Sequence, residues 1–104
     1  MPSRVKIIEC PRDAMQGIKT FIPTAHKVQY IQSLLRVGFD TIDFGSFVSP
    51  KAIPQMQDTA EVLAQLDLSQ TRSKLLAIVA NTQGAQLAAQ YSEIQYLGFP
   101  FSIS

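Results

Sequence analysis

The sequence predicts an α/β fold in which parallel strands alternate with helices. Short apolar runs rich in β-branched residues alternate with segments whose apolar residues recur at helical spacing. The connections between them are short, which is typical of a parallel sheet with right-handed crossovers. The expected order is β-α-β-α-β-α-β, and residues 1–104 form one domain without a linker. Periodicity alone fits either half of a barrel or a small open sheet.

The first strand and helix are predicted from local signals. Val5–Glu9 is rich in β-branched residues, and Pro11 ends the strand because proline has no N–H to donate to a sheet. The following residues are expected to form a loop. Thr24 is predicted to cap a helix that starts at Ala25, and Gly38 is predicted to end it. The apolar stripe of this helix consists of Val28, Ile31, Leu34 and Leu35.

A second strand is expected at Thr41–Phe44, with Gly45–Ser46 as its exit turn. Ser49–Met56 holds two prolines and is predicted to be an ordered loop without regular structure. Asp58 and Glu61 have the spacing of a capping box for the next helix. The buried face of that helix is expected to carry Val62, Leu63 and Leu66.

The last part of the chain repeats the pattern. Lys74–Val79 is apolar almost throughout, as is typical of a strand covered on both faces, and Asn81–Gly84 is predicted to be the loop after it. Ile94–Leu97 is the expected fourth strand. Between them, a short helix is expected to have on one side Leu87, Ala88 and Tyr91.

Composition excludes some classes of function and favours others. Net charge is +1, which argues against binding to nucleic acid or a membrane surface through charge. A single cysteine rules out an internal disulfide and favours a reducing, cytoplasmic location. We expect Cys10 to be a small buried thiol, His26 to be a surface residue, and Phe99 and Phe101 to belong to the core.

Polar residues follow the carboxyl ends of the expected strands, where the ligands of parallel α/β folds bind. Arg12 offers a permanently charged fork of donors, and Asp13 offers a hard oxygen ligand suited to Mg²⁺ or Mn²⁺. Taken alone, the two could also be an ordinary solvated pair on a turn. The full set that should converge is Arg12, Asp13, Gln16, Asp43, Ser46 and Asn81.

Two motifs resemble those of a known family. Arg12-Asp13-Ala14-Met15-Gln16 resembles the Arg-Asp-Gly-x-Gln signature of hydroxymethylglutaryl-CoA lyases and related metal-dependent enzymes. Ser46-Phe47-Val48-Ser49-Pro50-Lys51, followed by Pro54-Gln55-Met56, resembles a run of the lyase branch. The resemblance implies the first half of a TIM (β/α)8 barrel. Because such a barrel needs roughly 200 residues or more, we expect these 104 residues to be the N-terminal part of one lyase domain.

The resemblance also implies roles for individual residues. Asp13 matches a metal ligand for Mg²⁺ or Mn²⁺, and Arg12 and Asp43 match catalytic positions. The substrate, an acyl-CoA thioester, is expected to contact Gln16, Lys19, Ser46 and Asn81. The family's two metal-binding histidines and catalytic cysteine lie on later strands and loops, beyond Ser104. A homodimer is expected.

The sequence departs from the family pattern at three points. Ala14 replaces a glycine, and the loop between Glu9 and Pro11 is one residue shorter. At the third point, in the second strand, Asp43 replaces a glutamate and Phe44-Gly45 replaces a pair of threonines. The leading hypothesis is a lyase that cleaves a 3-hydroxy-acyl-CoA to acetyl-CoA and a keto acid. The alternatives are a related condensing or carboxyl-transfer barrel, similar to isopropylmalate synthase, and a degenerate barrel module without catalytic activity.

Overall fold

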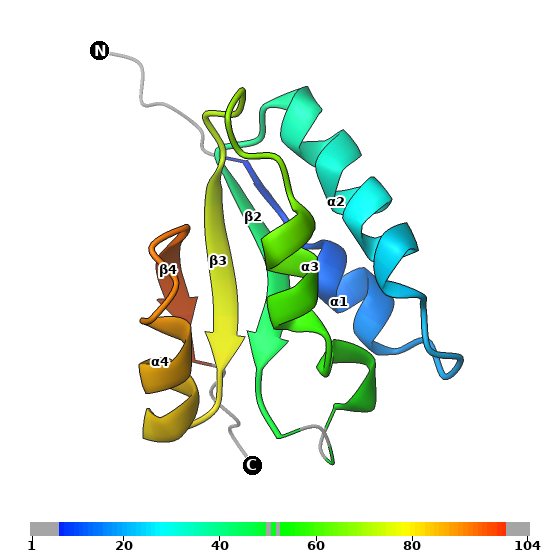
Figure 1. The fold of residues 1–104 in the computed structure, drawn as a ribbon, viewed down its shortest axis with the longest axis vertical. Coiled ribbons are helices and arrows are strands. Elements are labelled where there is room, and N and C mark those ends of the chain that lie inside the picture. The colour runs from blue at the N-terminus through cyan, green and yellow to red at the C-terminus, as the bar shows by residue number, and fades with distance from the viewer. Residues whose placement is uncertain (1–6, 50, 52, 100–104) are drawn as a thin grey trace.

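The computed structural model describes residues 7–49, 51 and 53–99. Their core is a four-stranded sheet in which neighbours in sequence are neighbours in space and every pair is parallel (Figure 1). The prediction of a parallel sheet is therefore confirmed. The strands are β1 (Ile8–Glu9), β2 (Thr41–Phe47), β3 (Lys74–Val79) and β4 (Ile94–Gly98).

Four helices and one 3-10 turn connect the strands. The bounds are α1 (Pro11–Gln16), α2 (Thr24–Val37), the 3-10 turn η1 (Pro54–Met56), α3 (Thr59–Gln65) and α4 (Thr82–Ala88). Figure 1 shows α3 and α4 lying across one face of the sheet, with α2 beside α3. The apolar stripe of α2 is confirmed, because Ile31 and Leu35 are buried and Val28 and Leu34 pack against the core. None of the described helices is long and apolar enough to cross a membrane.

Coverage of β3 is less complete than its sequence suggests. Leu75, Ala77 and Val79 are buried in the core shared with the helices, whereas Leu76 and Ile78 are only half-buried. The prediction of a strand covered on both faces is therefore wrong for the described residues. The half-buried side chains occupy alternate positions of β3 and so share one face of the sheet.

Two segments predicted to be loops are helical. Pro11 occupies the first turn of α1, where its missing N–H costs nothing and its fixed φ favours the helix. At α4, the Asn81 side chain accepts a hydrogen bond of 2.8 Å from the backbone N–H of Gly84, so the helix begins at Thr82. The helix ends at Ala88, so Tyr91 lies beyond it; Ala88 is buried and Leu87 is 46% exposed.

β2 runs to Phe47, past the exit turn predicted at Gly45–Ser46. The pairing with β3 shifts register between Asp43 and Gly45, so a bulge absorbs the irregularity without ending the strand. A side chain at Gly45 would meet the methyl group of Thr59 at 2.6 Å. Glycine therefore allows α3 to approach β2 closely. Pro54–Met56 also forms a 3-10 turn in the stretch predicted to lack regular structure.

Neither predicted N-terminal cap forms, because both side chains serve a buried ion pair. Thr24 is the first residue of α2 and donates a hydrogen bond of 2.6 Å to Asp58. Asp58 precedes α3 but makes no cap bond; it accepts from Lys27 Nζ at 2.6 Å. Lys27 is 2% exposed. A buried ammonium without a counter-charge costs more free energy than a missing cap, which explains the exchange of partners.

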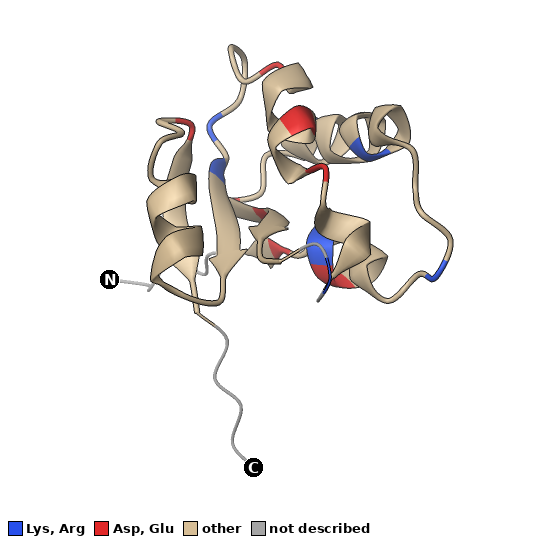
Figure 2. Cartoon of the chain, turned by 60° about the horizontal axis from the view of Figure 1, so that its bottom comes forward, with Lys and Arg blue, Asp and Glu red and all other residues tan. Residues whose placement is uncertain are grey.

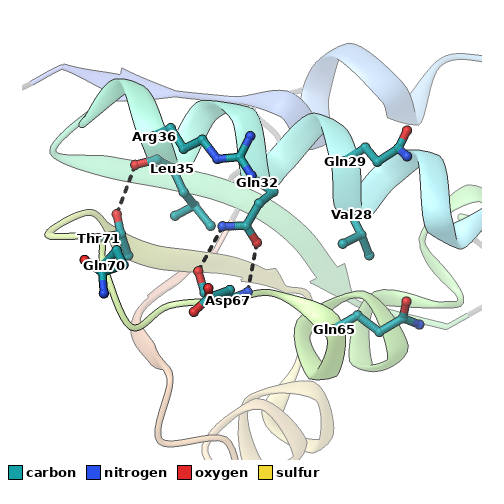
Figure 3. A pocket seen from close by; sticks show the side chains of 9 residues that line it. All are labelled: Val28, Gln29, Gln32, Leu35, Arg36, Gln65, Asp67, Gln70 and Thr71. Carbon is teal, nitrogen blue, oxygen red and sulfur yellow. Dashed lines mark hydrogen bonds between the residues drawn. The ribbon is translucent and has the colours of Figure 1, made fainter.

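The connection between α3 and β3 is held on α2 by side chains that imitate strand pairing. The Gln32 amide donates to the Asp67 carbonyl at 2.9 Å and accepts from the Asp67 N–H at 2.8 Å (Figure 3). Thr71 donates to the Leu35 carbonyl at 3.2 Å. These residues line a hollow of about 430 Å³. Its hydrogen bonds join the wall residues to one another, so we assign it a structural role.

The two outer strands expose apolar side chains. On the β1 side Ile7 and Ile8 are 58% and 55% exposed, and on the β4 side Tyr96 and Phe99 are 42% and 51% exposed. The expectation that Phe99 belongs to the core is therefore wrong, and Phe101 lies outside the described residues. Among the described strands, β1 and β4 each pair on one edge only. Apolar surface beside a free sheet edge is a recognised route to association.

The buried ion pair makes a prediction about stability. Lys27→Met should lower the free energy of unfolding by about 3–5 kcal/mol, because it leaves the Asp58 carboxylate buried without its counter-charge. Replacing both partners, as Lys27→Met with Asp58→Leu, should restore much of the loss. Urea titration of the variants measures the effect, with exposed Lys51→Met as the control. A double variant no more stable than the single one would contradict this account.

Candidate active site

An arginine from the first turn of α1 reaches the middle of β2. Arg12 Nε donates to both carboxylate oxygens of Asp43, at 3.0 and 2.9 Å. Arg12 follows directly from the end of β1, and Asp43 lies on the neighbouring strand. The pair therefore ties the exit of β1 to β2. The side chains are 16% and 6% exposed, so water screens this attraction less than it would screen a surface pair.

Gln16 completes the arrangement around the guanidinium. Its side-chain oxygen accepts from Arg12 NH1 at 2.7 Å, one helical turn further along α1. An arginine has five N–H groups. Hydrogen bonds within the described part of the chain occupy one on Nε and one on NH1. The guanidinium is thus fixed in orientation and keeps donors for a substrate oxygen.

Burial affects the protonation of Asp43. Loss of hydration raises the pKa of this carboxyl above its ordinary 3.8, the hydrogen bond and charge of Arg12 lower the pKa, and the negative charge of Asp13 raises it. Burial is the largest effect, so the net pKa shift is upward. Asp43 is 4% exposed and has both oxygens on Arg12. Its geometry suits it to orienting the guanidinium.

Asp13 lies beside Arg12 in the first turn of α1 and is exposed. Figure 2, in which the carboxyl ends of the strands come forward, shows adjoining basic and acidic positions on α1 beside the sheet. Within residues 7–49, 51 and 53–99, His, Cys, Asp and Glu form no group of three that could hold a metal ion. A carboxylate is the kind of oxygen ligand that Mg²⁺ and Mn²⁺ take, and a cation at Asp13 would need further donors.

The departures from the family pattern are accommodated locally. Ala14 lies inside α1, and no described non-glycine residue has a positive φ, so the helix does not require glycine there. Asp43 reaches Arg12 despite being one methylene shorter than glutamate. The expected burial of Cys10 is wrong: this residue is exposed, and partial loss of hydration raises the pKa of its thiol. The short link from β1 to α1 leaves it at the surface.

Ser46 and Asn81 come together in a second group, at the ends of β2 and β3. Both line a hollow of about 330 Å³, whose wall also includes Thr59 and Gly84. Ser46 is 2% exposed, and among the described residues its hydroxyl has no hydrogen-bond partner. A buried hydroxyl without a partner is costly. A ligand group in this hollow could supply the missing bond.

Lys19 lies on the connection between α1 and α2 and is exposed. It lines a hollow of about 230 Å³ together with Gln16, Phe21 and Gln55. Of the predicted site residues, the structure thus groups Arg12, Gln16 and Asp43 by contact. Lys19 shares a hollow with Gln16, whereas Ser46 and Asn81 form their own group.

Sequence reasoning missed three polar residues next to this region: Lys27, Gln55 and Asp58. A signal existed for Lys27, which lies four residues before Ile31 and hence on the apolar stripe of α2. Asp58 was interpreted as a helix cap. Gln55 gave no signal of its own beyond its place in the Pro-Gln-Met run, and its partners are backbone groups of a distant loop.

Known proteins share this sequence over most of its length. The cytoplasmic 3-hydroxy-3-methylglutaryl-CoA lyase of Rattus norvegicus is 38% identical over 101 residues, covering 94% of this chain and 29% of the rat protein. The 3-hydroxy-3-isohexenylglutaryl-CoA/hydroxymethylglutaryl-CoA lyase of Pseudomonas aeruginosa is 45% identical over 65 residues, covering 62% of this chain and 22% of that protein. A search of protein-family models found no match.

Solved structures agree with these relatives. A hydroxymethylglutaryl-CoA lyase from Pseudomonas aeruginosa matches with a TM-score of 0.81 and 35% identity, over 92% of this chain and 32% of that one. An HMG-CoA lyase from Acinetobacter baumannii, in complex with coenzyme A and 3-methylmalate, matches with a TM-score of 0.80 and 34% identity, over 88% and 30% of the two chains.

The similarity to these proteins extends over only part of their length. The chain spans less than a third of the length of the curated relatives it matches, and the structures it resembles are barrels of which it supplies a part. Its strands, their parallel order and its motifs all correspond to that part. The chain therefore belongs to the hydroxymethylglutaryl-CoA lyase family, as the N-terminal portion of its TIM barrel.

Proposed function

We propose that the protein containing this segment is a metal-dependent lyase that cleaves hydroxymethylglutaryl-CoA, or a similar 3-hydroxy-acyl-CoA, to acetyl-CoA and a keto acid. The observation that carries the proposal is Arg12, held by Asp43 and Gln16 with donors to spare, beside an exposed Asp13. Relatives named as lyases support it, and one of the similar structures is a complex with coenzyme A.

The reaction needs a cation where negative charge develops. A base takes the proton of the tertiary hydroxyl, the C–O bond becomes a carbonyl, and the neighbouring carbon–carbon bond breaks. Its electrons pass to the thioester as an enolate, which protonation converts to acetyl-CoA. Arg12 would donate to the oxygen of this enolate, and Asp43 and Gln16 would keep the guanidinium in place. Pre-orientation matters because the donors then need no rearrangement as charge forms.

A divalent Mg²⁺ or Mn²⁺ ion, when bound, would supply the Lewis acid that stabilises the alkoxide. Asp13 is the residue of this segment that we propose as its ligand, because its carboxylate is exposed beside Arg12. The remaining ligands would come from a part of the barrel outside these residues, as the family resemblance implies. We propose Gln16, Lys19, Ser46 and Asn81 as contacts of the acyl-CoA, with Ser46 supported by its buried, unpartnered hydroxyl.

The alternatives have weaker support. A condensing or carboxyl-transfer barrel would share the Arg12–Gln16 signature, but the relatives that match carry lyase names. A degenerate module would be favoured if the departures disrupted the site, whereas Ala14 fits α1 and Asp43 reaches Arg12. We also propose a homodimer, and a cytoplasmic location, which the single cysteine and the cytoplasmic rat relative support.

Asp13→Asn in the full-length protein should weaken binding of Mn²⁺, because it removes the charge of the ligand and keeps its shape. The loss should be at least about tenfold, since even residues that only support a metal ligand are worth that much. Isothermal titration with Mn²⁺ measures it, with Glu61→Gln, an exposed carboxylate on α3, as the control. Equal affinities in the wild type and Asp13→Asn would remove Asp13 from the metal site.

Arg12→Lys should leave Mn²⁺ affinity nearly unchanged and lower kcat. A point charge cannot replace the guanidinium fork, and losing one such donor typically costs about 10²–10³ in rate. The comparison requires metal affinity and turnover of hydroxymethylglutaryl-CoA on the same preparation, with exposed Arg36→Lys as the control. If Arg12→Lys turns over at the wild-type rate, the pair is only structural and the lyase proposal fails at its centre.

The 104-residue chain on its own should associate with itself, because β1 and β4 each offer an unpaired edge flanked by exposed apolar side chains. Sedimentation velocity over a range of concentrations measures this. Replacing Ile8 and Tyr96 by lysine should shift the distribution toward monomer, and the same change at exposed Val37, on α2, should not. A single monomeric species for the unmodified chain at all concentrations would contradict the expectation.

A further inference from the structure

One buried glutamine holds the connection between α1 and α2. Gln55 is 5% exposed, and its amide nitrogen donates to the carbonyls of Ile18 and Thr20 at 2.8 and 2.9 Å. Its amide oxygen accepts from the backbone N–H of Ile22 at 2.8 Å. Both N–H groups and the oxygen of the amide are therefore used on residues 17–23. This connection has no regular structure, so a single side chain satisfies three of its backbone groups.

Gln55 is itself fixed by the buried ion pair. Lys27 Nζ donates to the backbone carbonyl of Gln55 and to the carboxylate of Asp58. The Lys27 ammonium also lies 4.1 Å from the centre of the Phe21 ring. Phe21 belongs to the same connection. Gln55, Lys27 and Asp58, which we call the Gln55 clamp, thus bind residues 17–23 to η1, α2 and α3. All three residues are buried, so the clamp is rigid compared with a surface contact.

The clamp acts at the carboxyl end of α1. Gly17 is the only residue between the end of α1 and Ile18, the first residue that Gln55 bonds, and the Ile18 N–H bonds back to Met15 at 3.0 Å. At its other end, α1 is joined to β1, which has only two residues in the sheet. Because α1 is six residues long, it cannot hold its own position. Its place against β2 depends on Arg12–Asp43, on buried Met15 and on the clamp.

We infer that Gln55 is a positioning residue of the site: through residues 17–23 it holds α1 so that Arg12 stays on Asp43 and Lys19 stays at the mouth of its hollow. That these are reactive groups rests on the proposed function. The contacts of Gln55 are with backbone rather than with the substrate-facing side chains. Gln55 therefore acts on the site through the backbone of residues 17–23.

Hydrogen exchange measured by mass spectrometry on the full-length protein tests this directly. Gln55→Met keeps the length of the side chain and removes its polar groups. We expect amide exchange in residues 11–23 to accelerate by about tenfold or more, with β3 unchanged. Gln55→Asn keeps the amide on a side chain one methylene shorter, so it retains the donors and the acceptor and its effect should be smaller. Gln90→Met, at an exposed turn, is the control.

A second readout separates positioning from general stability. The Nε–H proton of Arg12 should give a slowly exchanging NMR signal in the wild type, and in Gln55→Met this signal should exchange faster. In the full-length protein kcat should fall, by up to about a hundredfold for a displacement near 1 Å, and KM should rise, because Lys19 lies in the released connection. Gln55→Asn should retain more of both properties than Gln55→Met.

Faster exchange in β3 as well as in residues 11–23 would show general destabilisation and overturn the inference, as would an unchanged Arg12 signal. If Gln55→Met does not fold, Gln55→Asn decides by the same criteria. The exchange and NMR results do not depend on turnover. Failure of the proposed function would appear as full activity of Arg12→Lys, whereas failure of this inference would appear as unchanged exchange in residues 11–23.

Discussion

The bond between Arg12 and Asp43 is the interaction on which the geometry of the site depends. It joins the helix that follows β1 to the interior of β2, across a boundary where α1 is too short to be stable alone. A carboxylate as buried as Asp43 must find a partner or take up a proton. Burial raises the pKa of Asp43, and the hydrogen bond and charge of Arg12 oppose that rise. Arg12 therefore stabilises the buried carboxylate. In return, Arg12 is oriented with donors left for a ligand.

Two buried ion pairs divide the work in this segment. In the Lys27–Asp58 pair the two charges face each other, and their further hydrogen bonds go to Thr24 and the Gln55 backbone carbonyl. This pair links α2, α3 and the connection after α1. Arg12–Asp43 is open, since part of its guanidinium is not used by described residues. An ion pair that bonds only to other parts of the fold suits a structural role, whereas one with unused donors suits a binding site. Their coupling through Gln55 explains how a scaffold contact could affect chemistry at α1.

Local patterns were sufficient for the sheet, because strands that alternate with helices have few ways to pack. They were insufficient where one side chain serves a distant partner. Thr24 and Asp58 are residue types that favour helix N-caps, but Thr24 bonds to Asp58 and Asp58 bonds to Lys27. Helix-capping patterns in the sequence do not predict these partners. Because of the bulge after Asp43, β2 continues past Gly45 and Ser46, a pair of residue types typical of turns. For the site, the motif indicated Arg12, Asp13 and Gln16, and the fold added Gln55.

The measurement that tests this account most directly is the titration of Asp43. Its carboxyl carbon and the Arg12 Nε–H proton should be followed together by NMR as the pH falls. The account predicts that Asp43 takes up its proton at a pH above its ordinary pKa of 3.8, and that the Arg12 signal loses protection at the same pH. An Arg12 signal that is indifferent to the titration of Asp43 would contradict it.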